Sequence, residues 1–142
     1  MSWVLDSSVV VKWYLIEPRH ENALTLLDQS PLLAPSLLPV EVAHVLTKRH
    51  RRRELDADAC RVIRASLARV PIELIDDRDL LDTALELSLR FRHGLYDCLY
   101  LACADLTGIP LVTDDRRLID RVERTPWRDR VVPLEALGRT AP

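Results

Sequence analysis

The chain has 142 residues, of which 48% are hydrophobic and 30% charged, and its net charge at pH 7 is −2. This composition predicts one globular domain over residues 1–142 that needs no disulfide or structural zinc, and it excludes a disordered chain. No run of about 18 apolar residues and no basic-then-apolar opening is present, so we expect a cytoplasmic protein without a membrane span or secretory signal. In such a reducing compartment Cys60, Cys98 and Cys103 are expected to be small core residues.

Short apolar runs alternate with segments of helical periodicity along the chain. The first helix is expected directly after the first strand, capped by Ser7 or Ser8. A later helix ends at Gly108 and Pro110, in the order typical of a helix C-terminus. The predicted strands are residues 3–5, 32–35, 72–75, 111–112 and 131–132. The predicted helices are residues 9–15, 36–51, 56–69, 76–93 and 95–107, with a short helix between the last two strands.

This alternation of short apolar strands with helices indicates parallel strands that are buried on both faces. With right-handed crossovers it predicts an α/β fold, a three-layer α/β/α sandwich around a parallel sheet. Ligands of such sheets bind beyond the carboxyl ends of the strands. Acidic residues that follow strands are therefore the first candidates for a functional site.

Four acidic residues are candidates for one site. Asp6 directly follows the first strand and Asp115 follows the strand at residues 111–112, so both are expected at the same edge of the sheet. Glu41 lies on the margin of an apolar helical stripe, and Asp97 lies in the first turn of a helix that is apolar nearly all round. Taken singly, Asp6 and Asp115 are equally well explained as helix N-caps, and Asp97 by the positive end of its own helix dipole.

Taken together, the four acids are harder to explain by capping. Two carboxylates about 4 Å apart repel by about 4 kcal/mol at an effective dielectric constant near 20, so four that converge need a cation. Oxygen-rich sites suit Mg²⁺ or Mn²⁺, which activate water and stabilise charge on a phosphoryl group. Asp114, beside Asp115, is a candidate only for a supporting role. Acids at predicted helix starts, such as Asp56 and Asp76, are explained by capping.

The segments around the four acids resemble the motifs of PIN-domain proteins, specifically VapC-type toxins. The resembling segments are residues 4–13 (VLDSSVVVKW), 34–43 (APSLLPVEVA), 96–102 (YDCLYLA) and 111–118 (LVTDDRRL). In the last segment the family has Thr-any-Asp, which assigns Asp115 rather than Asp114 to the acidic quartet: Asp6, Glu41, Asp97 and Asp115. The resemblance covers nearly the whole chain, in order.

The resemblance implies a Mg²⁺- or Mn²⁺-dependent endoribonuclease toxin whose acidic quartet is catalytic and ligates metal directly or through water. It assigns Ser8 and Thr113 as supporting hydroxyls, and it implies an RNA substrate, a cognate VapB-like antitoxin that blocks the site, and a homodimer. Because the quartet contains no His or Lys to act as a general base, we expect in-line attack by activated water, which leaves a 5′-phosphate and a 3′-hydroxyl.

Two other functions are compatible with parts of the sequence. A receiver domain of a signalling pair is also α/β and binds Mg²⁺, but it needs an acceptor aspartate after a middle strand and a lysine after the last one. Asp76 does follow a predicted strand, yet no lysine occurs after Lys48. The other alternative is a non-catalytic PIN-like RNA-binding module, which the intact quartet disfavours.

A dense basic block, residues 48–53, has two explanations. It is either a solvated helix C-terminus, where cations suit the helix dipole, or a patch for phosphate or an acidic partner. We expect a homodimer through this helix and the first helix, with the basic rim guiding RNA; the alternative is that both surfaces are simply solvated. The residues assigned to this interface are His44, Lys48, Arg51, Trp13 and Tyr14.

Overall fold

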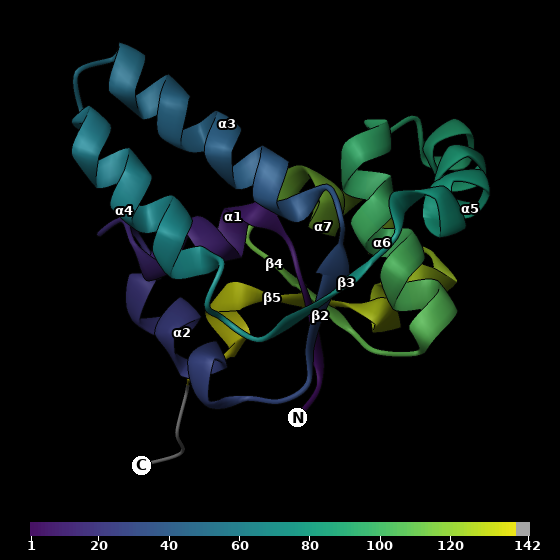
Figure 1. Ribbon diagram of the computed structural model, residues 1–142. Helices are drawn as coiled ribbons and strands as arrows, with labels where there is room; N and C mark the ends of the chain where they lie inside the picture. The colour runs from purple at the N-terminus through teal and green to yellow at the C-terminus, as the bar shows by residue number, and fades with distance from the viewer. Residues whose placement is uncertain (139–142) are drawn as a thin grey trace.

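A computed structural model describes residues 1–138 and contains a five-stranded parallel sheet in the order β3-β2-β1-β4-β5 (Figure 1). The strands are β1 (Trp3–Leu5), β2 (Leu32–Pro35), β3 (Ile72–Ile75), β4 (Leu111–Thr113) and β5 (Val131–Pro133). The predicted strands and their parallel pairing are confirmed. The domain is predicted to run to residue 142, and residues 139–142 lie outside the described part of the chain.

Helices cover both faces of this sheet. The longer helices are α3 (Leu38–Arg51), α4 (Ala57–Leu67), α5 (Asp77–Phe91) and α6 (Leu95–Thr107), and the short ones are α1 (Ser7–Val10), α2 (His20–Leu24) and α7 (Arg116–Val122). Four 3₁₀ turns complete the fold: η1 (Val11–Trp13), η2 (Thr25–Asp28), η3 (Pro126–Arg130) and η4 (Leu134–Ala136). None of these helices is both long and apolar enough to cross a lipid bilayer.

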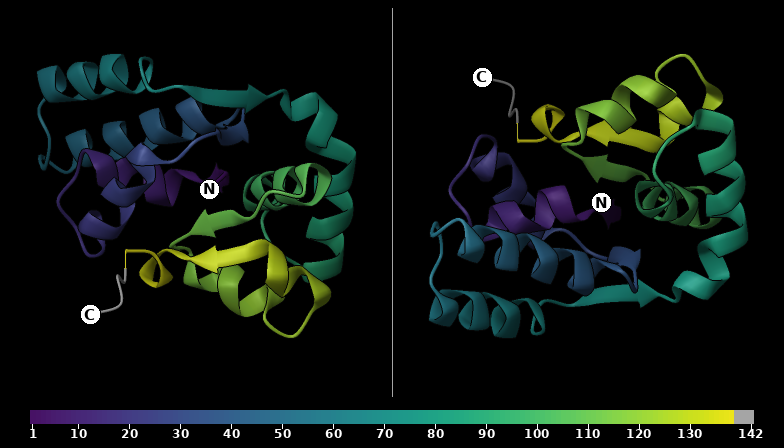
Figure 2. Two further views of the ribbon diagram at one scale, coloured as in Figure 1. Left: turned by 90° about the horizontal axis from the view of Figure 1, so that it is seen from below. Right: turned by 90° about the horizontal axis from the view of Figure 1, so that it is seen from above.

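The order of the strands explains the layers. The chain builds the sheet outward from β1 to β3, then crosses back to add β4 and β5 on the other side of β1. Because right-handed crossovers in opposite directions lie on opposite faces, α1 to α4 cover one face and α5 to α7 the other (Figure 2). The predicted three-layer α/β/α sandwich is confirmed.

The hydrophobic core surrounds β1 and α6. All three residues of β1 are buried, and α6 is buried continuously from Cys98 to Ala104. This explains its apolar circumference: α6 packs on β1, β2 and β4 on one side and on α5 on the other. Cys98 and Cys103 are buried in this core, while Cys60 is half-buried. Burial raises the pKa of Cys98 to about 11 and that of Cys103 to about 12, so both thiols are inert.

The first helical segment differs from the prediction. Asp6, not Ser7 or Ser8, caps α1 by accepting a hydrogen bond from the backbone N–H of Val9, and α1 continues as the 3₁₀ turn η1. Trp13 is 7% exposed, and its Nε1 donates to the carbonyl of Ala23 at 2.8 Å. Placing Trp13 on an intermolecular surface was therefore wrong, because α2, which was not predicted, covers it.

Candidate active site

Asp6 follows the central strand of the sheet and is 7% exposed. Its Oδ1 accepts hydrogen bonds from the Ser8 hydroxyl at 2.6 Å and from the Val9 N–H at 3.2 Å, and its Oδ2 accepts one from the Thr113 hydroxyl. Burial raises the pKa of Asp6 to about 7, although these three donors act in the opposite direction. The carboxylate is thus held in one orientation at a place where its negative charge is poorly solvated.

The same two hydroxyls connect Asp6 to the turn between β4 and α7. The Thr113 Oγ1 accepts from the backbone N–H of Asp115 at 3.0 Å, and the Ser8 Oγ accepts from the N–H of Asp114 at 3.1 Å. Asp115 in turn caps α7, because its Oδ1 accepts from the backbone N–H groups of Arg117 and Leu118. Asp6 and Asp115 therefore each cap a helix, and they are also neighbours at the same edge of the sheet.

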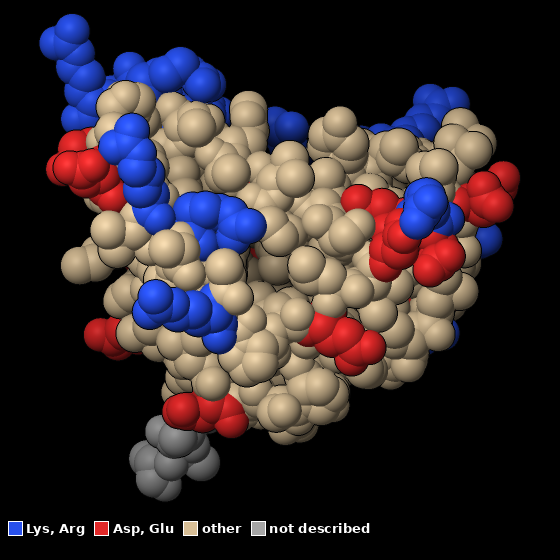
Figure 3. Space-filling model, viewed as in Figure 1, with Lys and Arg blue, Asp and Glu red and all other residues tan. Residues whose placement is uncertain are grey.

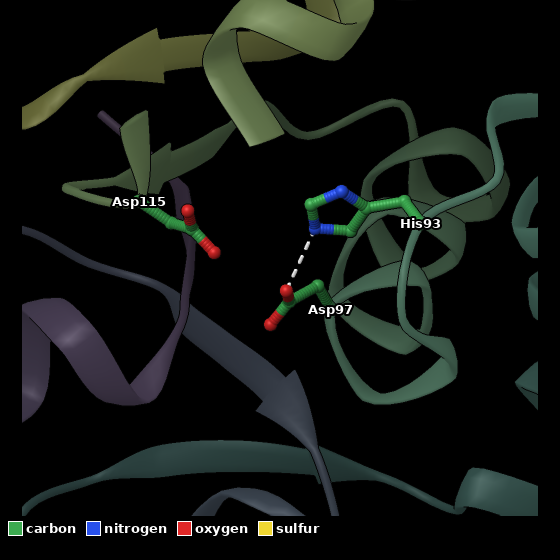
Figure 4. Close-up of side chains that lie close together, drawn as sticks. All are labelled: His93, Asp97 and Asp115. Carbon is green, nitrogen blue, oxygen red and sulfur yellow. Dashed lines mark hydrogen bonds and ion pairs between the residues drawn. The ribbon is translucent and has the colours of Figure 1, made fainter. Parts of the chain in front are cut away.

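Asp97 lies between two other polar side chains, as Figure 4 shows. The Nε2 of His93 lies 2.8 Å from its Oδ2, and one ligand atom each from His93, Asp97 and Asp115 lie within 4.8 Å of one another. Burial raises the pKa of Asp97, and the charge of Asp115 raises it further, while His93 opposes the change. His93 was not predicted as a site residue. It stands four residues before Asp97, but it lies between α5 and α6, and a spacing of four predicts a contact only within one continuous helix.

Glu41 reaches the site from the first turn of α3. The start of α3 is fixed against α5, because Asp77 accepts from the Leu37 N–H at 3.1 Å and donates its own N–H to the Ser36 Oγ at 3.0 Å. The Tyr100 hydroxyl lies near enough to Glu41 to lower the pKa of that carboxyl, although the two groups do not meet the geometry of a hydrogen bond. Both that hydroxyl and the Glu41 Oε1 are consequently buried without a partner among residues 1–138. Burial raises the pKa of Glu41, and the charge of Asp97 adds to the effect.

The other three acids of the quartet lie around Asp97. The charge of Asp97 raises the pKa of both Asp6 and Glu41, and the charge of Asp115 raises the pKa of Asp97. The structure therefore brings the acidic quartet into one electrostatic cluster. A hard divalent cation fits this donor set: the ligand atoms are carboxylate oxygens, and the Glu41 Oε1 has no other partner. His93 adds one nitrogen beside them.

Asp114 is held differently from its neighbour. Its carboxylate lies 2.6 Å from Arg19 and 3.3 Å from Lys12, which is 7% exposed and also contacts Glu17 at 3.1 Å. Glu17 in turn is bound by Arg49 of α3. The carboxylate of Asp114 makes no hydrogen bond to the quartet within the described residues, so its contact with the site is the backbone N–H that binds Ser8.

The receiver-domain alternative does not fit this arrangement. A receiver's acceptor aspartate follows a middle strand, whereas Asp76 follows β3, which is an edge strand. The carboxylate of Asp76 is 2.8 Å from the guanidinium of Arg78 and caps α5. The middle strand is β1, which ends at Asp6.

Comparison with known proteins identifies the family of this fold. The family model for the PIN domain matches residues 3–124. Ribonuclease VapC1 of Mycobacterium tuberculosis is 38% identical over 121 residues, covering 81% of this chain and 86% of that protein, and ribonuclease VapC3 of Pyrobaculum aerophilum is 30% identical over 124 residues, covering 85% and 95%. A chain from a toxin-antitoxin complex of Klebsiella pneumoniae has the same fold, with a TM-score of 0.64 and 18% identity over 92% of this chain and 96% of that one. This chain therefore belongs to the PIN domain family and to its VapC-type members.

Proposed function

We propose that this protein is a divalent-metal-dependent endoribonuclease, the toxin of a toxin-antitoxin pair, with Asp6, Glu41, Asp97 and Asp115 as the ligands of Mg²⁺ or Mn²⁺. The observation that carries the proposal is the cluster around Asp97. The charge of Asp97 raises the pKa of Asp6 and Glu41, the charge of Asp115 raises the pKa of Asp97, and the Glu41 Oε1 is buried without a partner among residues 1–138. The relatives named as ribonucleases support RNA as the substrate.

The chain's own residues prepare the site for a charged ligand. Ser8 and Thr113 orient Asp6, and Thr113 also holds the turn that carries Asp115. His93 orients Asp97 from the start of α6. A divalent cation held there supplies an activated water and stabilises the negative charge that develops on the phosphoryl group.

The test is cleavage of single-stranded RNA by the purified protein with Mg²⁺, with Mn²⁺ and with EDTA. We expect cleavage only with metal, and products with a 5′-phosphate and a 3′-hydroxyl. Asp97→Asn should abolish cleavage, whereas Asp105→Asn, a matched change on the same helix at an acid paired with Arg130 at 2.9 Å, should not. Cleavage in EDTA, or a 2′,3′-cyclic phosphate product, contradicts the metal-dependent mechanism. Binding without cleavage favours a non-catalytic RNA-binding module.

The partners follow from the same reasoning. The similar Klebsiella chain comes from a toxin-antitoxin complex, which supports a VapB-like antitoxin as the partner that blocks the site. We retain the homodimer as part of the proposal, now without Trp13; His44, Lys48 and Arg51 are exposed on α3, as a contact surface requires. Light scattering at micromolar concentration tests the dimer, and a monomer there contradicts it. Loss of RNA cleavage on addition of the protein encoded beside this one tests the antitoxin.

A further inference from the structure

A pocket of about 640 Å³ borders the acidic quartet on the side of Asp97 and Asp115. Three arginines line it: Arg92 after α5, and Arg117 and Arg121 on α7. The acids of the quartet repel an RNA strand by themselves, so a substrate needs cations along its path to reach them. Arginine suits this task, because its planar guanidinium binds phosphate oxygens in pairs and stays charged.

These three guanidiniums have no acidic partner within 4.0 Å among residues 1–138. In contrast, Arg49, Arg78 and Arg130 elsewhere on the surface form ion pairs. Asp120 lines the same pocket but is paired with none of the three. Their charge is therefore available to a ligand of the pocket.

Arg117 and Arg121 are four residues apart on α7. Side chains at this spacing are neighbours on one face of a helix, so both guanidiniums reach the same part of the pocket. Leu118 and Val122 of α7 are buried and anchor the helix on the core, and Asp115 caps it. The helix start that carries Asp115 therefore also positions the two arginines beside the quartet.

Arg92 has a backbone conformation that arginine rarely adopts. It ends α5 with φ of +51° and ψ of +44°, in the left-handed region where glycine or asparagine is usual. A left-handed non-glycine residue costs about 1 kcal/mol or more, and such residues often serve a function through their side chain. The side chain of Arg92 lies in the pocket wall next to His93, which contacts Asp97.

The basic block at residues 48–53 is less suited to hold the scissile region. Arg51 lies ten residues after Glu41 on α3, which is about 15 Å along the helix at 1.5 Å per residue. In Figure 3, Lys and Arg gather at the upper left, over the far end of the α3–α4 hairpin, and further basic side chains lie on the opposite side of the dip in the upper outline. The pocket arginines, unlike the block, share a cavity with two members of the quartet.

We propose that Arg92, Arg117 and Arg121 form a phosphate-binding subsite that holds the RNA backbone next to the acidic quartet. The subsite rests on the proposed ribonuclease function for its place in the reaction, but its affinity for RNA is measurable without cleavage. The substrate class is single-stranded RNA bound through its phosphates, without recognition of bases by these residues.

The test measures binding of a short labelled single-stranded RNA in EDTA, where cleavage is prevented, over a series of salt concentrations. Each phosphate contact contributes about −0.7 to the slope of log K against log salt for single strands. We expect the slope to become shallower by about 1.4 in the double variant Arg117→Gln/Arg121→Gln and by about 0.7 in Arg92→Gly. Arg69→Gln, which removes an exposed arginine between α4 and β3 at the opposite edge of the sheet, should leave the slope unchanged.

Two controls separate the possible failures. Arg92→Gly suits the left-handed backbone, so its melting temperature should equal or exceed that of the wild type while RNA affinity falls; this excludes unfolding as the cause.

Slopes that stay at the wild-type value in the pocket variants, or that change equally in Arg69→Gln, overturn the subsite. If the wild type cleaves RNA in that case, the proposed function still stands. If the pocket variants flatten the slope but the wild type does not cleave with Mg²⁺, the subsite stands and the ribonuclease proposal fails.

Discussion

Replacing Asp6 by Asn removes one negative charge from the cluster while it keeps the shape of the side chain. The two residues cap helices about equally well, so a residue that only capped α1 would tolerate the change with little effect on stability. In this structure Asp6 is also buried beside Asp97, and the raised pKa shows that its ionised form is disfavoured in the folded protein. We therefore expect Asp6→Asn to stabilise the metal-free protein and to abolish RNA cleavage.

The magnitude follows from the pKa of Asp6. A rise from 3.8 to about 7 is about 3 units, which at 1.36 kcal/mol per unit is about 4 kcal/mol. Because the folded pKa is the higher one, stability is greatest where both states are protonated, falls as the pH rises from about 4 to 7, and is then constant. Asparagine escapes this loss, but its amide leaves the Thr113 hydroxyl without its acceptor, which costs about 1–2 kcal/mol. The net gain above pH 7 is about 2–3 kcal/mol.

The assay is urea unfolding of the wild type and Asp6→Asn in EDTA, at a pH near 5 and at a pH near 8. The free energies of unfolding should nearly coincide at the lower pH, and the variant should be the more stable at the higher pH. Adding Mg²⁺ at the higher pH should stabilise the wild type more than the variant, because a ligand stabilises the state that binds it.

Three results would refute this reasoning. A variant that is equally stable to the wild type at both pH values shows that Asp6 carries no uncompensated charge. A variant that is destabilised at the higher pH shows that its hydrogen bonds to Ser8, Val9 and Thr113 outweigh its burial. A variant that gains as much stability from Mg²⁺ as the wild type shows that Asp6 is not at the metal site.

Three further changes test other parts of the structure. Glu41→Gln should leave stability in EDTA unchanged or higher, because the Glu41 Oε1 has no hydrogen bond to lose, while Mg²⁺ affinity measured by calorimetry falls roughly tenfold or more. His93→Gln should lower kcat/KM for RNA roughly 10–100-fold, less than Asp97→Asn does, since glutamine keeps a donor but not the ring that orients the carboxylate. Trp13→Phe should lower the free energy of urea unfolding by about 1–3 kcal/mol, because the Ala23 carbonyl loses its donor, and should leave the oligomeric state by light scattering unchanged.

The regular elements were predictable because local signals marked their ends. Asp56 caps α4 and Asp76 caps α5, as their positions before apolar helical stripes indicated. Gly108 ends α6 in the left-handed conformation that glycine favours. The short apolar runs form the parallel strands, and β1, β2 and β4 are buried on both faces as expected. The expectation was wrong for the edge strand β3, where Glu73 and Leu74 are exposed because no further strand or helix within residues 1–138 covers them. These features depend on residues that are close in sequence.

The errors concern contacts between segments that are distant in sequence or elements too short to show a period. Helix α2 has five residues, which is little more than one turn, so its sequence shows no helical periodicity. The burial of Trp13 beneath α2 was therefore not predictable either. Lys12 is buried because it meets Glu17 and Asp114, and the latter stands 102 positions later in the chain. No local pattern distinguishes such a lysine from an exposed one.

The candidate site was predictable in part for a similar reason. Each member of the quartet follows a strand or opens a helix, which is visible in the sequence. The sequence analysis treated helix capping and membership of the acidic cluster as alternatives, yet Asp6 and Asp115 have both roles. A helix that starts at the carboxyl edge of a sheet places its N-cap residue at that edge, where ligands of such sheets bind. His93 was missed because its contact with Asp97 spans a helix break.

The order of the strands has a consequence for the synthesis of this protein. β1 is the first strand to leave the ribosome, yet its neighbour β4 begins at Leu111, after more than three-quarters of the chain has been made. Until β4 pairs with β1, Thr113 does not reach Asp6, and Asp115 is absent from the cluster. A nascent or truncated chain that ends before this strand therefore has no complete acidic quartet. Under the proposed function such a chain does not cleave RNA, and activity begins only when synthesis is almost complete.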